Sequence, residues 1–260
     1  MGDILKMVKS ILITGTSSGI GRETAKLFAS KGWTVFATMR HPEQVHDYDA
    51  MGNVITYPLD VTDNDQIQKV VGNITDKYGT VDVVVNNAGY GLLGPFETNT
   101  RDEIKQQFDV NLFGMMDVTR AWLPGMRKKH VGIIINLSSL AGLVPFSVLS
   151  MYTVTKFAVE TFTETVGEEV APFGIKMKVV EPGPTNTNFN GRSMKEGSIH
   201  IRDYDQMITD YKKNSGSFVG GTPDTIANLI YEAATDGKDQ LHYATPEVKQ
   251  MGMDYRRKEI

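Results

Sequence analysis

The sequence contains no cysteine, which excludes disulfide bonds, thiolate nucleophiles and cysteine-ligated metal centres. Histidine is also scarce, and the five residues never form the His-Glu-x-x-His spacing of a zinc enzyme. They are His41, His46, His130, His200 and His242. We therefore expect solvated surface histidines and no metal site.

Long apolar runs are missing too. No stretch reaches the roughly 18–20 apolar residues that cross a membrane, and the first residues, MGDILKMVKS, contain no signal-peptide core. Gly2 does not suggest myristoylation, because Lys6 stands where that motif needs Ser or Thr. The net charge is only −4, with acids and bases interleaved, so we expect no nucleic-acid or membrane partner. These features predict a soluble cytoplasmic protein.

The 260 residues, 40% of them hydrophobic, suit one domain over 1–260, and no linker or repeat divides it. Short β-branched runs alternate with longer amphipathic segments. Strands are predicted at Val8–Thr14, Thr34–Met39, Val54–Pro58, Val81–Val85, Gly132–Leu137, Lys176–Val180 and Gln240–Ala244. Helices are predicted at Gly19–Lys31, Asp63–Tyr78, from Thr100, at Asn111–Lys129 with a break near Pro124, at Ser150–Val170 and from Pro223. The alternation predicts an α/β fold, a doubly wound parallel sheet of about seven strands with helices on both faces.

One segment, 185–221, departs from this pattern. It is polar, rich in Asn, Ser and Gly, and lies between a predicted strand and the last predicted helix. A long insertion at the carboxyl end of a strand is a usual place for an active-site lid, so we expect a substrate lid here. The alternative is a surface loop without a function.

A glycine-rich turn, Thr14-Gly15-Thr16-Ser17-Ser18-Gly19-Ile20-Gly21, follows the first strand and opens the first helix. Glycines let a phosphate approach the backbone, and a helix N-terminus offers free N–H groups and the positive end of the helix dipole. Its position in an α/β pattern favours dinucleotide binding, although a tight turn without a ligand remains the alternative.

The segment Ser138–Lys156 contains the residues best suited to chemistry. Tyr152 and Lys156 are separated by one helical turn and share a helix face. An ammonium group beside a phenol favours the phenolate, so we expect Lys156 to lower the pKa of Tyr152 from about 10 and to create an acid/base. Ser138 and Ser139, at the mouth of a strand, can hydrogen-bond a substrate oxygen. The alternative is an ordinary amphipathic helix after an ordinary loop.

With these features in view, the chain resembles the short-chain dehydrogenase/reductase family from about Val8 to Ala244. The turn TGTSSGIG matches the family's cofactor turn, and LDVTD at 59–63 matches the segment that meets the adenine, with Asp60 as its acid. NNAG at 86–89 matches the motif after the fourth strand, and EPGPTNT at 181–187 matches the segment that touches the nicotinamide. The surroundings NAGYGLLGPFE, APFGIK and VEPG are most similar to soluble hydroxysteroid and retinol dehydrogenases.

The resemblance implies a Rossmann fold and hydride transfer between a nicotinamide and a carbonyl or secondary alcohol. It implies that Tyr152 is the acid/base, that Ser139 hydrogen-bonds the same substrate oxygen, and that Lys156 holds the nicotinamide ribose. In that family, an asparagine at the position of Asn111 anchors a water that links the lysine to solvent. The implied cofactor-binding residues are Gly15, Ser17, Ser18, Gly19, Ile20, Gly21, Arg40, Asp60, Val61, Asn87, Ala88, Gly89, Tyr152, Lys156, Pro182, Gly183, Thr185 and Thr187.

The end of the second strand favours NADP(H) over NAD(H). An NAD-dependent enzyme of this fold usually has an acid there, which binds the ribose 2′-hydroxyl and repels a 2′-phosphate. Here that position is Met39, and the next residue, Arg40, can form a forked pair with a phosphate. Ser18 stands where many NADP-linked relatives carry a second base, and Arg40 as a solvated loop residue is the alternative.

The substrate is expected to be apolar. The predicted pocket walls are Tyr90–Phe96, Leu140–Val148 and 185–221, with Leu143, Val144, Phe146, Leu149 and Phe189 as apolar lining. Steroids, retinoids, fatty ketones and xenobiotic carbonyls fit this description equally.

We also expect a homodimer or homotetramer. The helix at Ser150–Val170 carries Phe157, Val159, Phe162 and Val166, more apolar surface than one sheet contact needs. In the family that this chain resembles, the equivalent helix commonly forms a symmetric contact.

Two other functions remain open. One is a dinucleotide-binding redox sensor or scaffold without catalysis, which usually lacks the Tyr or the Lys, and both are present here. The other is a nucleotide-sugar epimerase or dehydratase, which shares Tyr-x-x-x-Lys but usually has a longer C-terminal substrate domain than this chain provides.

Overall fold

A seven-stranded parallel sheet forms the centre of the molecule. The computed structural model describes residues 9–185, 193–215 and 221–258, and within them the strand order is β3-β2-β1-β4-β6-β7-β9. The strands are β1 (Ser10–Thr14), β2 (Thr34–Met39), β3 (Val54–Pro58), β4 (Val83–Asn86), β6 (Gly132–Leu137), β7 (Ile175–Val180) and β9 (His242–Tyr243). The predicted α/β fold with a doubly wound parallel sheet is therefore confirmed.

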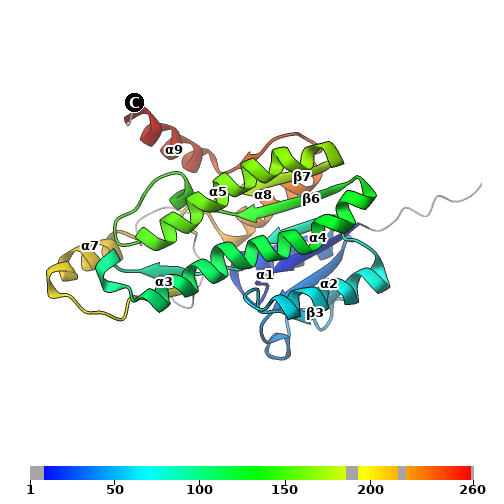
Figure 1. Ribbon diagram of the computed structural model, residues 1–260, viewed down its shortest axis with the longest axis horizontal. Helices are drawn as coiled ribbons and strands as arrows, with labels where there is room; N and C mark the ends of the chain where they lie inside the picture. Colours follow the sequence, from blue (N-terminus) through cyan, green and yellow to red (C-terminus); the bar gives the residue numbers. More distant parts are fainter. Residues whose placement is uncertain (1–8, 186–192, 216–220, 259–260) are drawn as a thin grey trace, which may run out of the picture.

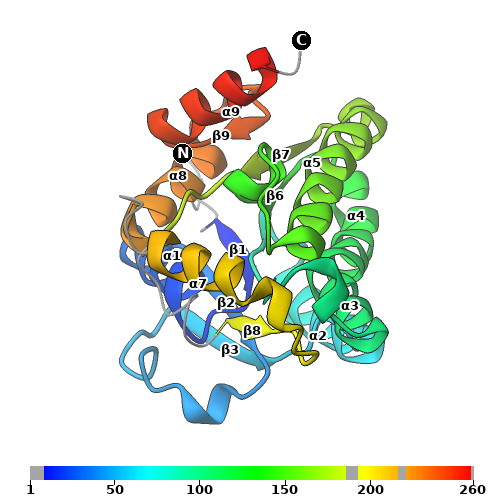
Figure 2. The same cartoon turned by 90° about the vertical axis from the view of Figure 1, so that its left-hand side faces the viewer.

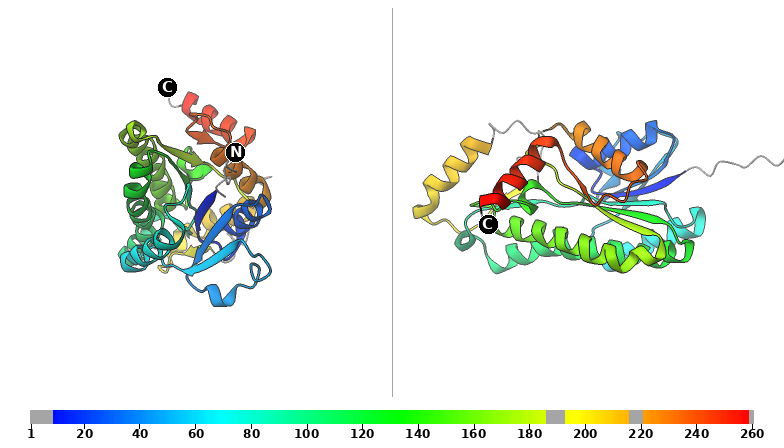
Figure 3. Two further views of the ribbon diagram at one scale, coloured as in Figure 1. Left: turned by 90° about the vertical axis from the view of Figure 1, so that its right-hand side faces the viewer. Right: turned by 90° about the horizontal axis from the view of Figure 1, so that it is seen from above.

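Helices cover both faces of this sheet (Figures 1 and 3). One face carries α2 (Asn64–Tyr78), α4 (Met115–Lys129) and α5 (Ser150–Val170), and the other carries α1 (Gly19–Ser30) and α8 (Pro223–Thr235). Successive strand residues point to opposite faces, so Val84 packs in the core with Trp122 of α4 while Val85 packs in the core with Phe28 of α1. Burial on both faces explains the continuous apolar runs in the strand sequences.

The strand order reverses between β1 and β4, because β2 and β3 lie on one side of β1 while β4, β6, β7 and β9 lie on the other. In open parallel sheets such a switch point leaves a crevice outside the carboxyl ends of the strands. The glycine turn, the NNAG segment and the Ser138–Ser139 pair all follow strands at this edge. The sheet therefore brings together motifs that are far apart in the sequence.

The predicted break near Pro124 is wrong. The helix α3 (Arg101–Phe108), a π-helical turn η3 (Asp109–Gly114) and α4 follow each other directly, and Pro124 lies inside α4. Proline removes one intrahelical hydrogen bond, but Trp122 and Met126 on either side of it are buried in the core. Packing of this face against the sheet keeps the helix continuous. The predicted capping box is confirmed, with Thr100 N donating to Glu103 Oε2 at 2.7 Å and Glu103 N donating to Thr100 Oγ1 at 3.3 Å.

Several described elements were not predicted. A second, two-stranded parallel sheet joins β5 (Gly91–Leu93) to β8 (Met194–Glu196). Two further helices, α7 (Asp205–Ser215) and α9 (Pro246–Lys258), lie at the end of the molecule that faces the viewer in Figure 2. Short 3₁₀ turns complete the chain: η1 (Pro42–Gln44), η2 (Phe96–Thr98), η4 (Leu140–Gly142), η5 (Ala171–Phe173) and η6 (Arg202–Tyr204). Among the described residues, no helix has both the length and the apolar character to cross a membrane.

Candidate active site

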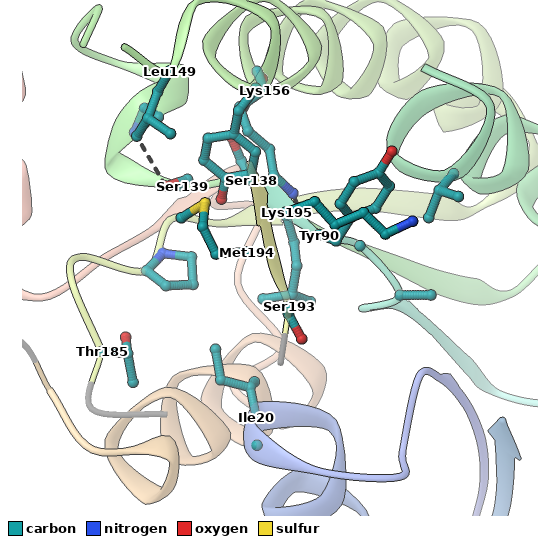
Figure 4. A pocket seen from close by; sticks show the side chains of 18 of the residues that line it. Ile20, Tyr90, Ser138, Ser139, Leu149, Lys156, Thr185, Ser193, Met194 and Lys195 are labelled. Carbon is teal, nitrogen blue, oxygen red and sulfur yellow. Dashed lines mark hydrogen bonds between the residues drawn. The ribbon is translucent and has the colours of Figure 1, made fainter. Parts of the chain in front are cut away.

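A cavity of about 1160 Å³ lies at the carboxyl ends of the strands. Ser138, Ser139 and Lys156 border it from one side and Ile20 and Thr185 from another (Figure 4). Most of the predicted cofactor residues also line it: Gly15, Ser17, Ser18, Gly19, Ile20, Arg40, Asp60, Val61, Asn87, Ala88, Gly89, Tyr152, Lys156, Pro182, Gly183 and Thr185. Gly21 and Asn111 lie outside the lining, and Thr187 lies outside the described residues.

The glycine turn leaves room for a ligand against its backbone but no room for side chains at Gly15 or Gly21. Gly15 has a φ of +70°, and a Cβ on it would lie 2.9 Å from the Cα of Ala88. Gly21 serves a different purpose from the predicted one, because its Cβ would lie 2.4 Å from both the Gly15 oxygen and the Asn87 amide. It allows α1 to pack against the turn and does not face the cavity.

The first turn of α1 is suited to an anion. Its N-cap residue, Ser18, makes no side-chain capping bond, so the N–H groups at this helix end have no side-chain acceptor from it. Asn87 fixes the turn from the β4 side, since its Nδ2 donates to the oxygens of Thr14 at 2.8 Å and Gly15 at 3.0 Å. The residues present therefore fit the pyrophosphate of a dinucleotide.

Tyr152, Ser139 and Lys156 meet at the inner end of the cavity. Tyr152 is hydrogen-bonded to Ser139, and the Ser139 Oγ also accepts from the backbone N of Ala141 at 3.1 Å. The Lys156 ammonium donates to the Leu137 oxygen at 2.7 Å and lies 5.6 Å from the centroid of the Tyr152 ring. All three side chains come from the end of β6 or from the first turns of α5.

The pKa of Tyr152 differs from the value expected from the sequence. Burial raises the pKa of Tyr152 to about 12, against a smaller lowering by the Ser139 hydrogen bond. Burial likewise lowers the pKa of Lys156 to about 8, while the nearby Glu160 carboxylate raises it. The prediction that Lys156 lowers the pKa of Tyr152 is therefore wrong for the protein without ligand. The Lys156 ammonium lies over the Tyr152 ring and is hydrogen-bonded to the Leu137 carbonyl. Desolvation of the phenol therefore has the larger effect on the pKa of Tyr152.

Asn111 lies in the π-helical turn η3 and acts on the backbone of Tyr90. Its Oδ1 accepts from Tyr90 N at 3.0 Å, and its Nδ2 donates to Tyr90 O at 2.8 Å and to Thr155 Oγ1 at 3.4 Å. π turns are rare in proteins, but those that occur are often found at functional sites. Such a turn changes the direction in which one side chain points. Here it aims a buried asparagine between the NNAG segment and α5, so Asn111 fixes the cavity wall without lining it.

One end of the cavity contains Met39, Arg40 and Asp60, the residues predicted to meet the adenosine part of the cofactor. Met39 is buried and uncharged, whereas Arg40 is exposed and makes no ion pair with any carboxylate in the described part of the chain. The Asp60 carboxylate accepts from the backbone N of Thr62 at 2.9 Å and from its hydroxyl at 2.7 Å. A phosphate near Arg40 would thus meet a cation with no internal competitor among these residues.

The other end of the cavity combines apolar side chains with polar ones such as Lys195, Asp210 and Asn214, and its walls differ partly from the prediction. Phe146, Val148 and Leu149 line it, whereas Leu143 and Val144 pack under α9 with Leu140, Ala244 and Val248. The sequence indicated the segment after β7 but not its contributing residues, which include Met194, Lys195, Met207 and Tyr211. No spacing in the sequence distinguishes these side chains. Phe189 lies outside the described residues.

A second group of ionisable residues, which no sequence pattern predicted, lies behind Lys156. Glu160 follows Lys156 by one turn of α5 and is buried together with Glu181. Burial and the Glu181 carboxylate raise the pKa of Glu160 to about 8. The third member, His242, has a raised pKa chiefly because it is hydrogen-bonded to Glu181.

Comparison with known proteins places these features in a family. A family model described as short chain dehydrogenase matches residues 9–197. A 3-ketodihydrosphingosine reductase of Bacteroides thetaiotaomicron is 38% identical over 195 residues, which cover 75% of this chain and 71% of that protein. An oxidoreductase of Botryotinia fuckeliana is 35% identical over 254 residues, covering 92% of each chain.

Solved structures of similar fold also include a short-chain dehydrogenase. A short-chain dehydrogenase from Streptomyces avermitilis superposes with a TM-score of 0.88 at 34% identity, covering 97% of this chain and 94% of that one. The protein ElxO, solved with NADP bound, superposes with a TM-score of 0.77 at 28% identity, covering 94% of this chain and 100% of that one.

Proposed function

Because this chain belongs to the short-chain dehydrogenase family and is an oxidoreductase acting on CH–OH or carbonyl groups, we propose that it transfers hydride between NADP(H) and an apolar carbonyl or secondary alcohol. In this proposal Tyr152 is the acid/base. The observation that carries it is the Tyr152–Ser139 hydrogen bond at the inner end of a cavity lined by the glycine turn.

When bound, the nicotinamide supplies or accepts the hydride. In reduction, the Tyr152 hydroxyl gives its proton to the substrate oxygen. Ser139 donates a hydrogen bond to the same oxygen and stabilises the charge that develops there. Lys156 holds the ribose, and Asn111 holds Tyr90 and the end of NNAG in place. In oxidation, Tyr152 removes the alcohol proton.

The substrate proposal rests on the apolar side chains that line one end of the cavity. Phe146, Leu149, Met194 and Met207 present carbon and sulfur there, and methionine adapts to ligands of different shape. The segment 185–221, whose described part contains β8 and α7, supplies Met194 and Met207, and we propose that it is the substrate lid. The Bacteroides relative is named for the reduction of a keto compound, 3-ketodihydrosphingosine, which agrees with a carbonyl substrate.

The proposed preference for NADP(H) rests on Arg40 in the cavity lining and on the absence of an acid at Met39. The bound NADP in the related ElxO structure agrees with it. We further propose that the enzyme is a homodimer or homotetramer that buries the outer face of α5.

The proposal is tested by measuring turnover of purified protein with NADPH and NADH on a panel of apolar ketones. Wild type should reduce at least one ketone, with kcat/KM for NADPH at least roughly tenfold above that for NADH, about the strength of one charge-assisted bond. Tyr152→Phe should bind NADPH as wild type does but lose nearly all turnover, because only the transferable proton is removed. Arg40→Ala should lose most of the cofactor preference. Near-normal turnover in Tyr152→Phe would show that another group is the acid/base.

A further inference from the structure

Three ionisable side chains from separate parts of the fold meet behind the inner end of the cavity. Glu160 comes from α5, Glu181 follows β7 directly, and His242 begins β9. Their nearest oxygen and nitrogen atoms all lie within 4.8 Å of one another. Neither the proposed hydride transfer nor the sequence patterns gives this cluster a role.

The donor atoms of the cluster lie near the spacing of ligands around one ion, although His242 and Glu181 stand at hydrogen-bond distance. His242 Nδ1 lies 2.6 Å from Glu181 Oε1 and 3.6 Å from Glu160 Oε2. Donor atoms bound to zinc at about 2.0–2.2 Å stand roughly 3–3.5 Å apart in tetrahedral or octahedral geometry. Small side-chain movements would therefore bring all three donor atoms to coordination distance.

Glu160 is poorly compensated by the described residues. Both of its carboxylate oxygens are buried without a close, well-aligned hydrogen bond, and the nearby Ser138 hydroxyl lowers the pKa of Glu160 less than burial and the Glu181 carboxylate raise it. Its side chain is only 9% exposed and that of Glu181 only 2%, while one imidazole serves both. Buried carboxylates are normally paired or bound to a metal, because each is costly to remove from water.

The surroundings of His242 also resemble those of a metal ligand. Its Nδ1 faces the two buried carboxylates, and its Nε2 lies 3.4 Å from Glu164 Oε1, on the next turn of α5. Metal-binding histidines usually donate their second ring N–H to a carboxylate, which orients the ring. The His242 side chain is 39% exposed, so an ion can reach the cluster from solvent.

We propose that Glu160, Glu181 and His242 bind one divalent transition-metal ion. Two carboxylates and an imidazole suit Zn²⁺ or Mn²⁺ better than Mg²⁺ or Ca²⁺, which prefer oxygen ligands alone. The ion joins α5, the end of β7 and β9. Glu181 immediately precedes Pro182 and Gly183 of the cavity lining, so the site stabilises the fold behind the cavity and takes no part in hydride transfer.

The test is Zn²⁺ binding to metal-stripped, tag-free full-length protein, measured by calorimetry and by metal content after desalting. Wild type should retain one Zn²⁺ per chain. Glu160→Gln and His242→Ala should each bind at least about 100-fold more weakly, since loss of a direct ligand exceeds the 10–100-fold effect of losing an outer partner. Glu164→Gln should weaken Zn²⁺ binding by a smaller factor, at least about tenfold, because Glu164 faces the second ring nitrogen of His242 and is not itself a ligand.

His46→Ala is the matched control. His46 also pairs with a carboxylate, since its Nδ1 lies 3.0 Å from Asp49 Oδ2, but it is exposed and no third donor from the described residues joins the pair. It should bind Zn²⁺ as wild type does. Zn²⁺ should also raise the thermal midpoint of wild type and leave that of Glu160→Gln unchanged, and Glu160→Gln should fold because a neutral amide replaces a buried charge. Equal Zn²⁺ binding in wild type, Glu160→Gln and His242→Ala, or no retained Zn²⁺ in wild type, would mean that protons alone satisfy the cluster.

Discussion

Adjacent serines at the end of β6 differ in what their hydroxyls contact. Ser139 is hydrogen-bonded to Tyr152, whereas the Ser138 Oγ donates to the backbone oxygen of Lys156 at 3.4 Å. Ser139→Ala should therefore lower kcat by roughly tenfold to a thousandfold, the usual effect of losing one bond to a developing oxyanion. Ser138→Ala should change kcat little. Steady-state kinetics of both variants with one substrate decides between them, and a larger effect at Ser138 would reverse the assignment.

Lys156 links stability to pH in the protein without cofactor. Its folded-state pKa is lowered from 10.5 to about 8, so the charged form is disfavoured in the fold. The stability cost is complete below pH 8 and is relieved as pH rises from about 8 to 10.5, because there the unfolded chain binds a proton that the folded chain does not.

The free energy of unfolding of wild type should therefore rise relative to that of Lys156→Met over this pH range. Urea unfolding of both proteins at pH 8 and pH 10 measures the difference, and the variant serves as the reference for all other titrating groups. A constant difference would mean that Lys156 keeps its usual pKa in the fold.

At the level of elements, the π turn η3 packs closely against Val61 in the cavity wall. A Cβ on Gly114 would lie 2.7 Å from the backbone oxygen of Val61 and 2.9 Å from its Cγ2. Gly114→Ala should destabilise the fold by about 1–3 kcal/mol through overpacking. It should also weaken cofactor binding, because Val61 lines the cavity.

Gly72 on α2 provides the matched control, since a Cβ there meets no atom within 4 Å. Gly72→Ala should leave cofactor affinity unchanged and stabilise the helix by up to about 1 kcal/mol. Thermal unfolding and NADPH titration of both variants measure the two effects. Equal stability of the two variants would show that the close approach of η3 to Val61 is not tight.

At the level of the whole molecule, α5 presents one apolar face to the protein and another to solvent. Val159 is buried against Leu112 and Met115, so it packs inside the chain. Val154 and Phe157 remain 46% and 40% exposed. Phe162 and Val166, which were predicted to contribute to an oligomer contact, pack against the core instead, so the proposed contact rests on Val154 and Phe157.

Phe157→Glu should therefore convert the proposed oligomer to monomer, because it places a charge in that contact. Phe96→Glu, at an exposed phenylalanine on η2, should leave the oligomer intact. Light scattering at micromolar concentration gives the masses, and a monomeric wild type would contradict the proposed assembly.

The order and type of the main elements, and the place of the glycine turn between β1 and α1, could be predicted from the sequence. These properties are local. β-branched runs, 3.6-residue periodicity, the Thr100 cap and the glycine turn each act within a few residues, and the structure places them as predicted. The short elements β5, β8, α7 and α9 were missed because their formation depends on contacts with distant parts of the chain.

The charges at the site and the neighbours of its residues depend on how the whole chain packs, and the sequence did not predict them. The pKa of Tyr152 rises where its sequence neighbour Lys156 predicted a fall, because desolvation depends on everything packed around the phenol. Glu160, Glu181 and His242 meet only because β7 and β9 pair beside α5. Burial and long-range pairing are properties of the packed chain, and no local pattern in the sequence records them.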